Sequence, residues 1–81
     1  MGVAYFGLDR LEEARESFER AMEIEPEEMK VIYNLAITYE KLQIFKRAEE
    51  LFRRVAEMEP KSLDEKGWVK KAKNKIQKMP D

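Results

Sequence analysis

Residues 31–60 read VIYNLAITYEKLQIFKRAEELFRRVAEMEP, and this stretch decides the fold. Apolar residues recur along it at steps of three and four, which is the spacing of one face of an α-helix. They form two stripes, Ile32, Leu35, Ala36 and Tyr39, and then Phe45, Ala48, Leu51, Phe52 and Val55. This spacing predicts two amphipathic helices, over residues 28–41 and 45–58. The link over residues 42–44 is short, so the two helices must run antiparallel. Pro60 ends the unit, because proline has no N–H to donate to a helix.

An earlier copy of this unit lies upstream. A shift of 34 residues lays nine residues on identical ones, at the pairs 5/39, 8/42, 14/48, 16/50, 18/52, 20/54, 23/57, 25/59 and 26/60. The repeat predicts one domain in three parts: a truncated repeat over residues 1–26, a complete repeat over residues 27–60 and a capping helix over residues 61–81. In the first part we expect a helix to end at residue 6, a turn over residues 7–10 and a helix over residues 10–24.

The third part differs from the repeats. Ser62 and Glu65 have the spacing of a capping box, in which each side chain accepts a hydrogen bond from an N–H group at the start of a helix. A thin apolar stripe follows, made of Leu63, Val69, Ala72, Ile76 and Met79. A lone helix with a polar outer face suits the exposed end of a repeat array. The chain is therefore predicted to be all-α.

Composition narrows the class of protein. The chain has 81 residues, of which 43% are hydrophobic and 41% are charged, and it contains no Cys or His. This mixture is typical of amphipathic helices and excludes disulfides and thiol chemistry. No apolar run approaches the 18 residues of a membrane span, so we expect a soluble, cytoplasmic protein. Abundant Glu, Lys and Arg are also consistent with a thermostable one.

Charge is divided unevenly along the chain. Residues 1–60 carry 9 basic and 14 acidic side chains, a net charge of −5, whereas residues 61–81 carry 7 and 3, a net charge of +4. Such polarity could steer an acidic partner to the C-terminal end or favour head-to-tail contacts between copies. The alternative is a lysine-rich helix surface that only meets solvent.

The repeat resembles the tetratricopeptide repeat (TPR), a helix-turn-helix unit of 34 residues. The residues that match its pattern are Leu35, Ala36, Tyr39, Ala48, Phe52 and Pro60, with Met1, Gly2, Tyr5, Ala14, Phe18 and Pro26 in the upstream copy. The resemblance implies a fragment of an α-solenoid, built from antiparallel helix-turn-helix repeats. It also implies a protein-protein interaction module, or adaptor, that binds a peptide or helix of a partner in a concave groove.

The resemblance places that groove on the first helix of each repeat. The predicted partner-binding residues are Lys30, Tyr33, Asn34, Ile37, Glu40, Lys41, Trp68 and Lys71, and Val3, Phe6 and Asp64 extend the set. Tyr33 and Trp68 are the expected anchors, because exposed aromatic residues dominate many interfaces. The alternatives are plain helix surface and, for Trp68, packing within the cap. A clamp for a terminal carboxylate is rejected, because Asn34 alone matches its residues.

Self-association is the alternative function. The first repeat lacks about six residues of its opening helix, which would leave Phe18 and Ala21 thinly covered. Another copy could supply the missing cover, so a homodimer formed by end-to-end packing or helix exchange is the second hypothesis.

Other function classes have little support. Without His or Cys the chain lacks the usual general base, metal ligand and thiolate, so no enzyme activity, metal site or cofactor is expected. Two lysine rows, Lys66, Lys70 and Lys73, and Lys71, Lys75 and Lys78, next to Trp68 could contact nucleic acid. The sequence pI near 5.6 argues against that partner.

Overall fold

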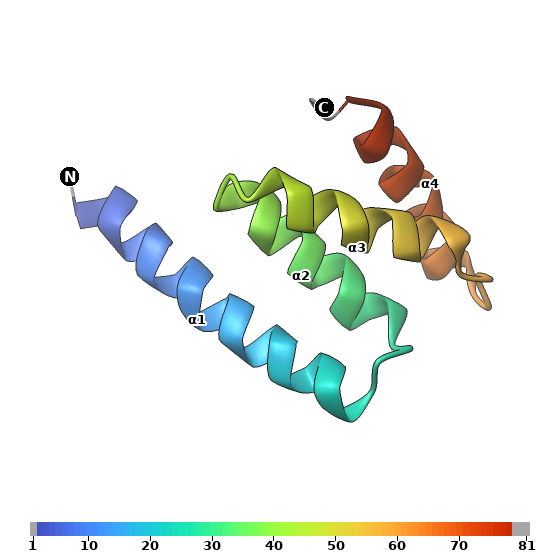
Figure 1. The fold of residues 1–81 in the computed structure, drawn as a ribbon, viewed down its shortest axis with the longest axis horizontal. Coiled ribbons are helices and arrows are strands. Elements are labelled where there is room, and N and C mark those ends of the chain that lie inside the picture. The colour runs from blue at the N-terminus through green and yellow to red at the C-terminus, as the bar shows by residue number, and fades with distance from the viewer. Residues whose placement is uncertain (1, 79–81) are drawn as a thin grey trace.

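The computed structural model describes the backbone of residues 2–78 and the side chains of residues 10–78. It contains four helices, α1 (Gly2–Ile24), α2 (Met29–Lys41), α3 (Phe45–Glu57) and α4 (Leu63–Lys78). No strand occurs in the described backbone, so the predicted all-α class is confirmed. Figure 1 shows α2 and α3 crossing at the centre, with α1 along one side of the pair and α4 at the other end.

The first helix differs from the prediction. α1 is continuous from Gly2 to Ile24, so the turn expected over residues 7–10 is wrong. Gly7 costs a helix interior only about 1 kcal/mol, and no proline lies within α1 to break its hydrogen-bond ladder. Pro26 does mark the end of α1: the Glu25 N–H donates to the Ala21 carbonyl at 2.8 Å, and α2 begins three residues after the proline.

The α2–α3 connection is the short link predicted, and its geometry is specific. Gln43 has φ 64°, in the left-handed region. Its N–H donates to the Glu40 carbonyl at 3.0 Å, and the Ile44 N–H donates to the Tyr39 carbonyl at 2.9 Å. These two bonds form a Schellman motif, which satisfies carbonyls at the end of α2. The predicted boundaries are within one residue at the start of α2 and the end of α3, where caps are commonly counted differently.

The core lies between α2, α3 and α4. Its most buried side chains are Ile32 and Ala36 of α2, Ala48, Phe52 and Val55 of α3, and Ala72 of α4. The predicted stripes therefore mark the core, with two exceptions on α3. Phe45 is 39% exposed because it is the first residue of the helix, beside the loop. Leu51 is only partly buried because no helix covers its side of α3.

The start of α4 confirms the predicted cap. The Glu65 N–H donates to Ser62 Oγ at 3.2 Å, and Glu65 Oε1 accepts the Lys61 N–H at 2.8 Å. Val69 and Ala72 are buried, but Leu63 is 84% exposed, so its assignment to the apolar stripe is wrong. Leu63 is the first residue of α4, and the buried residues of this helix begin further along, at Val69. Met79 lies outside the described residues.

α1 is held on one side only. It packs against α2, and in the described part of the chain no Cα atom of α1 comes within 8 Å of α3 or α4. Phe18 and Met22 reach the core from α1 and are partly buried. The residues that were expected to be thinly covered, Phe18 and Ala21, are thus both intermediate in burial. Separately, none of the described helices is long and apolar enough to cross a membrane.

Candidate partner-binding surfaces

Two aromatic side chains join α2 to α4. Tyr33 and Trp68 stack, with ring centroids 6.2 Å apart and planes 12° from parallel. Tyr33 also meets the buried ring of Phe52 edge-on, at 5.9 Å between centroids. Both Tyr33 and Trp68 remain partly exposed. The two predicted anchors therefore form one aromatic platform, and Trp68 serves the packing of α4 as well as the surface.

An ion pair lies beside this platform. Lys75 Nζ donates to Glu40 Oε1 at 2.8 Å, with both side chains partly buried. Burial raises the pKa of the Tyr33 phenol; the positive charge of Lys75 lowers this pKa, while Glu40 raises it. Lys75 was absent from the predicted partner-binding residues. Its place in a row with Lys71 and Lys78 was the signal that could have included it.

We call the surface of the eight predicted residues the α2–α4 face. Lys30, Lys41 and Lys71 are exposed on it, whereas Asn34, Ile37 and Glu40 are intermediate in burial like the aromatic pair. The Asn34 carbonyl accepts a hydrogen bond from the buried Thr38 hydroxyl at 2.8 Å. The side chains of Val3 and Phe6 lie outside the described residues.

Positive charge dominates this face. On α4, Asp64, Lys75 and Lys78 lie on the same side of the helix as Trp68 and Lys71, at spacings of three or four residues. They extend the α2–α4 face beyond the eight predicted residues. Together the charged residues are Lys30, Lys41, Lys71, Lys75 and Lys78 against Glu40 and Asp64, five positive and two negative charges, a net charge of +3. In the described part of the chain, Lys30, Lys41 and Lys71 have no ion-pair partner within 4.0 Å. These ammonium groups are available to an acidic partner.

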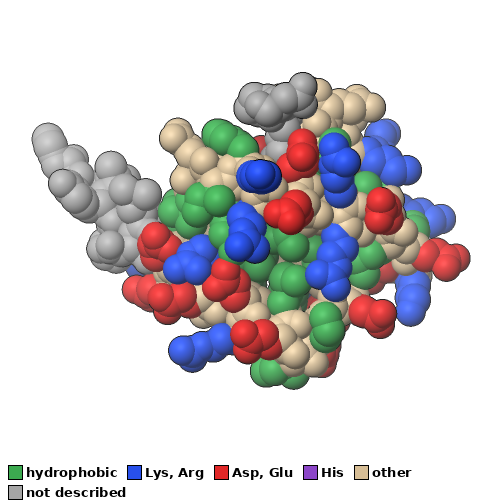
Figure 2. Space-filling model, in the orientation of Figure 1, with side chains coloured by type: hydrophobic (Ala, Val, Ile, Leu, Met, Phe, Trp, Pro, Cys, Tyr) green, Lys and Arg blue, Asp and Glu red, His purple; other side chains and the backbone are tan. Residues whose placement is uncertain are grey.

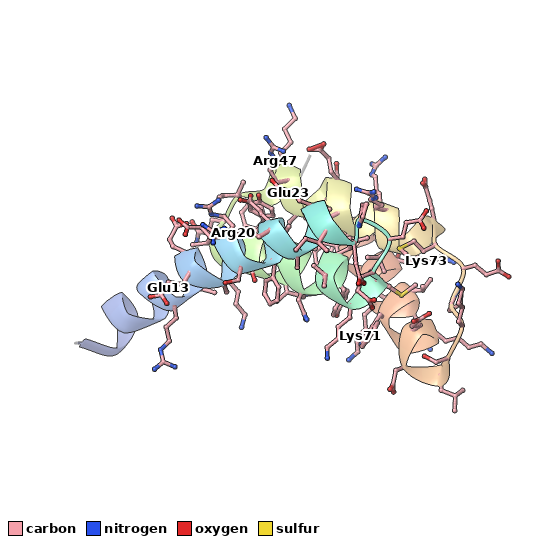
Figure 3. All side chains as sticks on the ribbon, turned by 90° about the horizontal axis from the view of Figure 1, so that it is seen from below. Glu13, Arg20, Glu23, Arg47, Lys71 and Lys73 are labelled. Atoms are coloured by element: carbon pink, nitrogen blue, oxygen red, sulfur yellow. The ribbon has the colours of Figure 1, made fainter. Side chains whose placement is uncertain are left out.

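The opposite side of the molecule holds a groove that the sequence did not predict. It has a volume of about 630 Å³ and lies between α1 and α3, with α2 as its floor. We call it the α1–α3 groove. Its lining residues include Met22, Glu23, Leu35, Tyr39, Arg47 and Leu51. Figure 2 shows this side, with hydrophobic side chains in the centre and charged ones around them. Figure 3 places Glu23 and Arg47 on the other side of the molecule from Lys71.

A polar network joins α1 to α2 beside the groove. The Tyr39 hydroxyl donates to Glu19 Oε2, and Arg15 donates to Glu12 Oε1 at 2.8 Å and to Glu19 Oε1 at 3.0 Å. Burial raises the pKa of Tyr39, and its bond to Glu19 raises it further. The hydrogen bond to Glu12 is the main cause that raises the pKa of Arg15. This network fixes how α1 sits on α2.

Comparison with known protein families shows which family this chain belongs to. The family model described as "RMD1-3: Regulator of microtubule dynamics protein 1-3" matches residues 9–80. The chain belongs to this family. No curated protein and no solved structure matched it.

The assignment to the TPR family is therefore wrong. The matching family has a different description, and the match spans residues 9–26 of the predicted truncated repeat, the whole predicted complete repeat and the predicted cap as far as residue 80. There is a physical reason why this pattern does not identify the TPR family. Small residues, aromatic residues and prolines at 34-residue spacing report how a helix pair packs and ends, and packed helix pairs recur in unrelated α-proteins. The continuous α1, in place of a helix pair over residues 1–26, is a departure from the repeat in this structure.

Among the described residues, no group of three or more acidic side chains is arranged to hold a metal ion.

Proposed function

We propose that this chain is a non-catalytic protein-interaction module in the regulation of microtubule dynamics. The microtubule part of the proposal is supported by the family, which is described as a regulator of microtubule dynamics. We infer further that the α2–α4 face binds an acidic segment of a microtubule protein or of a protein bound to microtubules. The same proposal puts the chain in the cytoplasm, where microtubules assemble.

The observation that carries the proposal is the aromatic platform among unpaired lysines. Tyr33 and Trp68 stack at the surface, and Lys30, Lys41 and Lys71 belong to the same face without ion-pair partners in the described structure. Aromatic side chains lose little conformational entropy on binding and anchor interfaces, while rim charges steer a partner of opposite sign. The net charge of +3 on this face, from five lysines against Glu40 and Asp64, favours an acidic segment.

The absence of catalysis is argued from chemistry. The chain has no His and no Cys, and its hydroxyl groups other than tyrosine are Ser17, Thr38 and Ser62. Thr38 donates to the Asn34 carbonyl, and Ser62 accepts the Glu65 N–H as a helix cap. These roles occupy Thr38 and Ser62, and the exposed Ser17 hydroxyl makes no hydrogen bond to a carboxylate in the described structure, so none of the three is held by a general base.

The test is sedimentation with microtubules polymerised from tubulin that retains its associated proteins. Lys71→Glu reverses a charge on the α2–α4 face, and Lys73→Glu makes the same change on another side of α4 (Figure 3). Both lysines are exposed, so both variants should fold. We expect Lys71→Glu to weaken co-sedimentation about fivefold, as the loss of a favourable rim charge and the gain of a repulsive one. The matched Lys73→Glu should sediment like the wild type.

Equal behaviour of the two variants would show that any binding is non-specific attraction to a basic helix. Failure of the wild-type chain to sediment with these microtubules would refute the proposal itself.

Self-association is the second candidate function, through a homodimer or longer assembly. Two observations favour it: α1 packs against α2 alone, and residues 2–28 are acidic whereas α4 is basic. Opposite charges at two ends permit head-to-tail contacts between copies. Light scattering over a range of concentration and salt tests it. A monomer mass throughout, with Lys71→Glu still defective in sedimentation, excludes this alternative.

A further inference from the structure

We propose that the α1–α3 groove is a second docking site, which takes an amphipathic helix of a partner with basic residues along one edge and acidic residues along the other. This site is separate from the α2–α4 face. Glu23 and Arg47 of the groove lie on the other side of the molecule from Lys71 (Figure 3). The inference therefore goes beyond the function proposed above.

The shape of the groove suits one helix. α1 and α3 both pack on α2, yet no Cα atom of one lies within 8 Å of the other in the described chain. The space between them has a volume of about 630 Å³ and α2 beneath it. A groove with a helix on each side and an apolar floor can receive an amphipathic helix.

The floor of the groove is apolar. Leu35 and Tyr39 of α2 reach it from below, Met22 from α1 and Leu51 from α3. Met22 and Leu51 are only partly buried, although each belongs to the apolar stripe of its helix. A third helix laid between α1 and α3 would cover both side chains. The apolar stripe of the incoming helix is inferred from this uncovered surface.

The two walls carry opposite charge. The α1 wall has Glu19 and Glu23, a net charge of −2, and the α3 wall has Arg47, Arg53 and Arg54 against Glu50 and Glu57, a net charge of +1. Glu19 is held by Tyr39 and Arg15, whereas Glu23 and Arg47 have no ion-pair partner in the described structure. The unpaired Glu23 favours a basic residue on the nearer edge of the incoming helix. The unpaired Arg47 favours an acidic residue on the other edge.

The probe is a synthetic peptide about four helical turns long, roughly 14 residues. It has a leucine stripe, lysines along one edge and glutamates along the other, and a fluorophore at one end. Anisotropy titration measures its affinity for the wild-type chain. A second peptide with the same leucine stripe and glutamates on both edges is the peptide control. We expect saturable 1:1 binding of the first peptide, and at least about fivefold weaker binding of the second.

Charge reversal in the protein tests the walls one at a time. Glu23→Lys and Arg47→Glu should each weaken binding about fivefold, because a favourable edge contact becomes a repulsive one. The double variant exchanges the signs at the two positions. The peptide can then lie in the opposite direction, so its affinity should rise above that of either single variant, a result that loss of packing alone would not produce. The matched controls are Glu13→Lys and Arg20→Glu on exposed positions of α1 that do not line the groove.

Three outcomes would overturn the inference: no saturable binding of the peptide, equal affinity of the single reversals and the controls, or no recovery in the double variant. A wild-type dimer that Glu23→Lys converts to a monomer would instead assign the groove to a second copy, and would also overturn it. Because Glu23 and Arg47 lie away from the α2–α4 face, both reversals should sediment with microtubules like the wild type. Failure of one proposal is therefore distinguishable from failure of the other.

Discussion

Gln43 decides how α2 turns into α3. It is the only described residue other than glycine with a positive φ, at 64°, and its place in the Schellman motif requires that conformation. A side chain with a Cβ atom pays about 1–2 kcal/mol in the left-handed region, which glycine does not pay. The sequence predicted a tight link at residues 42–44, but without a glycine there it gave no sign of which residue would carry the strain.

Replacing Gln43 by glycine should therefore stabilise the protein. We expect Gln43→Gly to raise the free energy of unfolding by about 0.5–1 kcal/mol, since relief of the left-handed strain outweighs the greater backbone entropy of glycine in the unfolded chain. Urea denaturation measures the change. Gln43→Ala keeps the Cβ atom and is the control, with stability near the wild type. A glycine variant less stable than the alanine variant would contradict this account of the turn.

Tyr39 is the residue through which α1 and α2 respond to pH. Its pKa is raised in the folded state, above the value of about 10 expected in the unfolded chain. The folded state therefore holds the phenolic proton more tightly. This contribution to stability is complete below pH 10 and is lost as pH rises through the folded-state pKa.

We expect the free energy of unfolding to fall as the pH rises above 10, and to fall less in Tyr39→Phe than in the wild type. Urea denaturation at pH 8 and at pH 11 measures both slopes. Tyr33→Phe is the comparison, because the pKa of Tyr33 is raised as well and its ring lies on the other side of α2. If wild type and Tyr39→Phe lose the same stability between these two pH values, the pKa of Tyr39 is not raised in the folded state.

At the level of helices, α4 is the element that local sequence describes best. Its cap, Ser62 with Glu65, was predicted from spacing and is present. Gly67 is the weak point of the helix, since glycine in a helix interior costs about 0.8–1 kcal/mol relative to alanine. A Cβ atom placed at Gly67 would have no heavy atom within 4 Å, apart from those of Gly67, its two chain neighbours and the nearby backbone of α4 itself.

Gly67→Ala should accordingly stabilise the protein by about 0.5–1 kcal/mol. Thermal denaturation followed by circular dichroism measures this, and the melting temperature should rise by about 2–8 °C for a domain of this size. Ser62→Ala serves as the opposite change, with an expected loss of about 1 kcal/mol from the missing cap. A destabilised Gly67→Ala would mean that the surroundings of Gly67 have no room for a methyl group.

Element boundaries followed from the sequence where the signal is local. Caps, prolines and three-residue links act within a few positions, so α2, α3 and the start of α4 were predicted to within one residue. The turn at residues 7–10 was inferred from Gly7 and Asp9, residue types that favour a reversal of the backbone, and α1 runs through it. Exposure of Phe45 and Leu63 depends on which helix lies next to each residue, and periodicity along one helix carries no such information.

The whole molecule presents two different surfaces. The residues of the α2–α4 face were taken from the TPR resemblance, and Tyr33 and Trp68 were singled out because they fall outside the core stripes of their helices; that this face binds a partner stays a prediction. The α1–α3 groove was not predicted, because it arises from the gap between two helices that share α2 as a neighbour. The charge polarity of the chain was visible in the sequence, but the opposite signs of the groove walls required the arrangement of the helices.

The central claim is that the α2–α4 face, rather than the lysine-rich helix as a whole, receives an acidic segment. The most direct test is an NMR titration of the isotope-labelled chain with a short glutamate-rich peptide. Trp68 is the single tryptophan, so its indole N–H gives one resolvable signal at the centre of the face. We predict saturable shifts at Trp68, Tyr33 and Lys71, with Glu23 and Arg47 unchanged. Shifts spread equally over all the lysines of α4, with the indole signal of Trp68 unmoved, would contradict the claim.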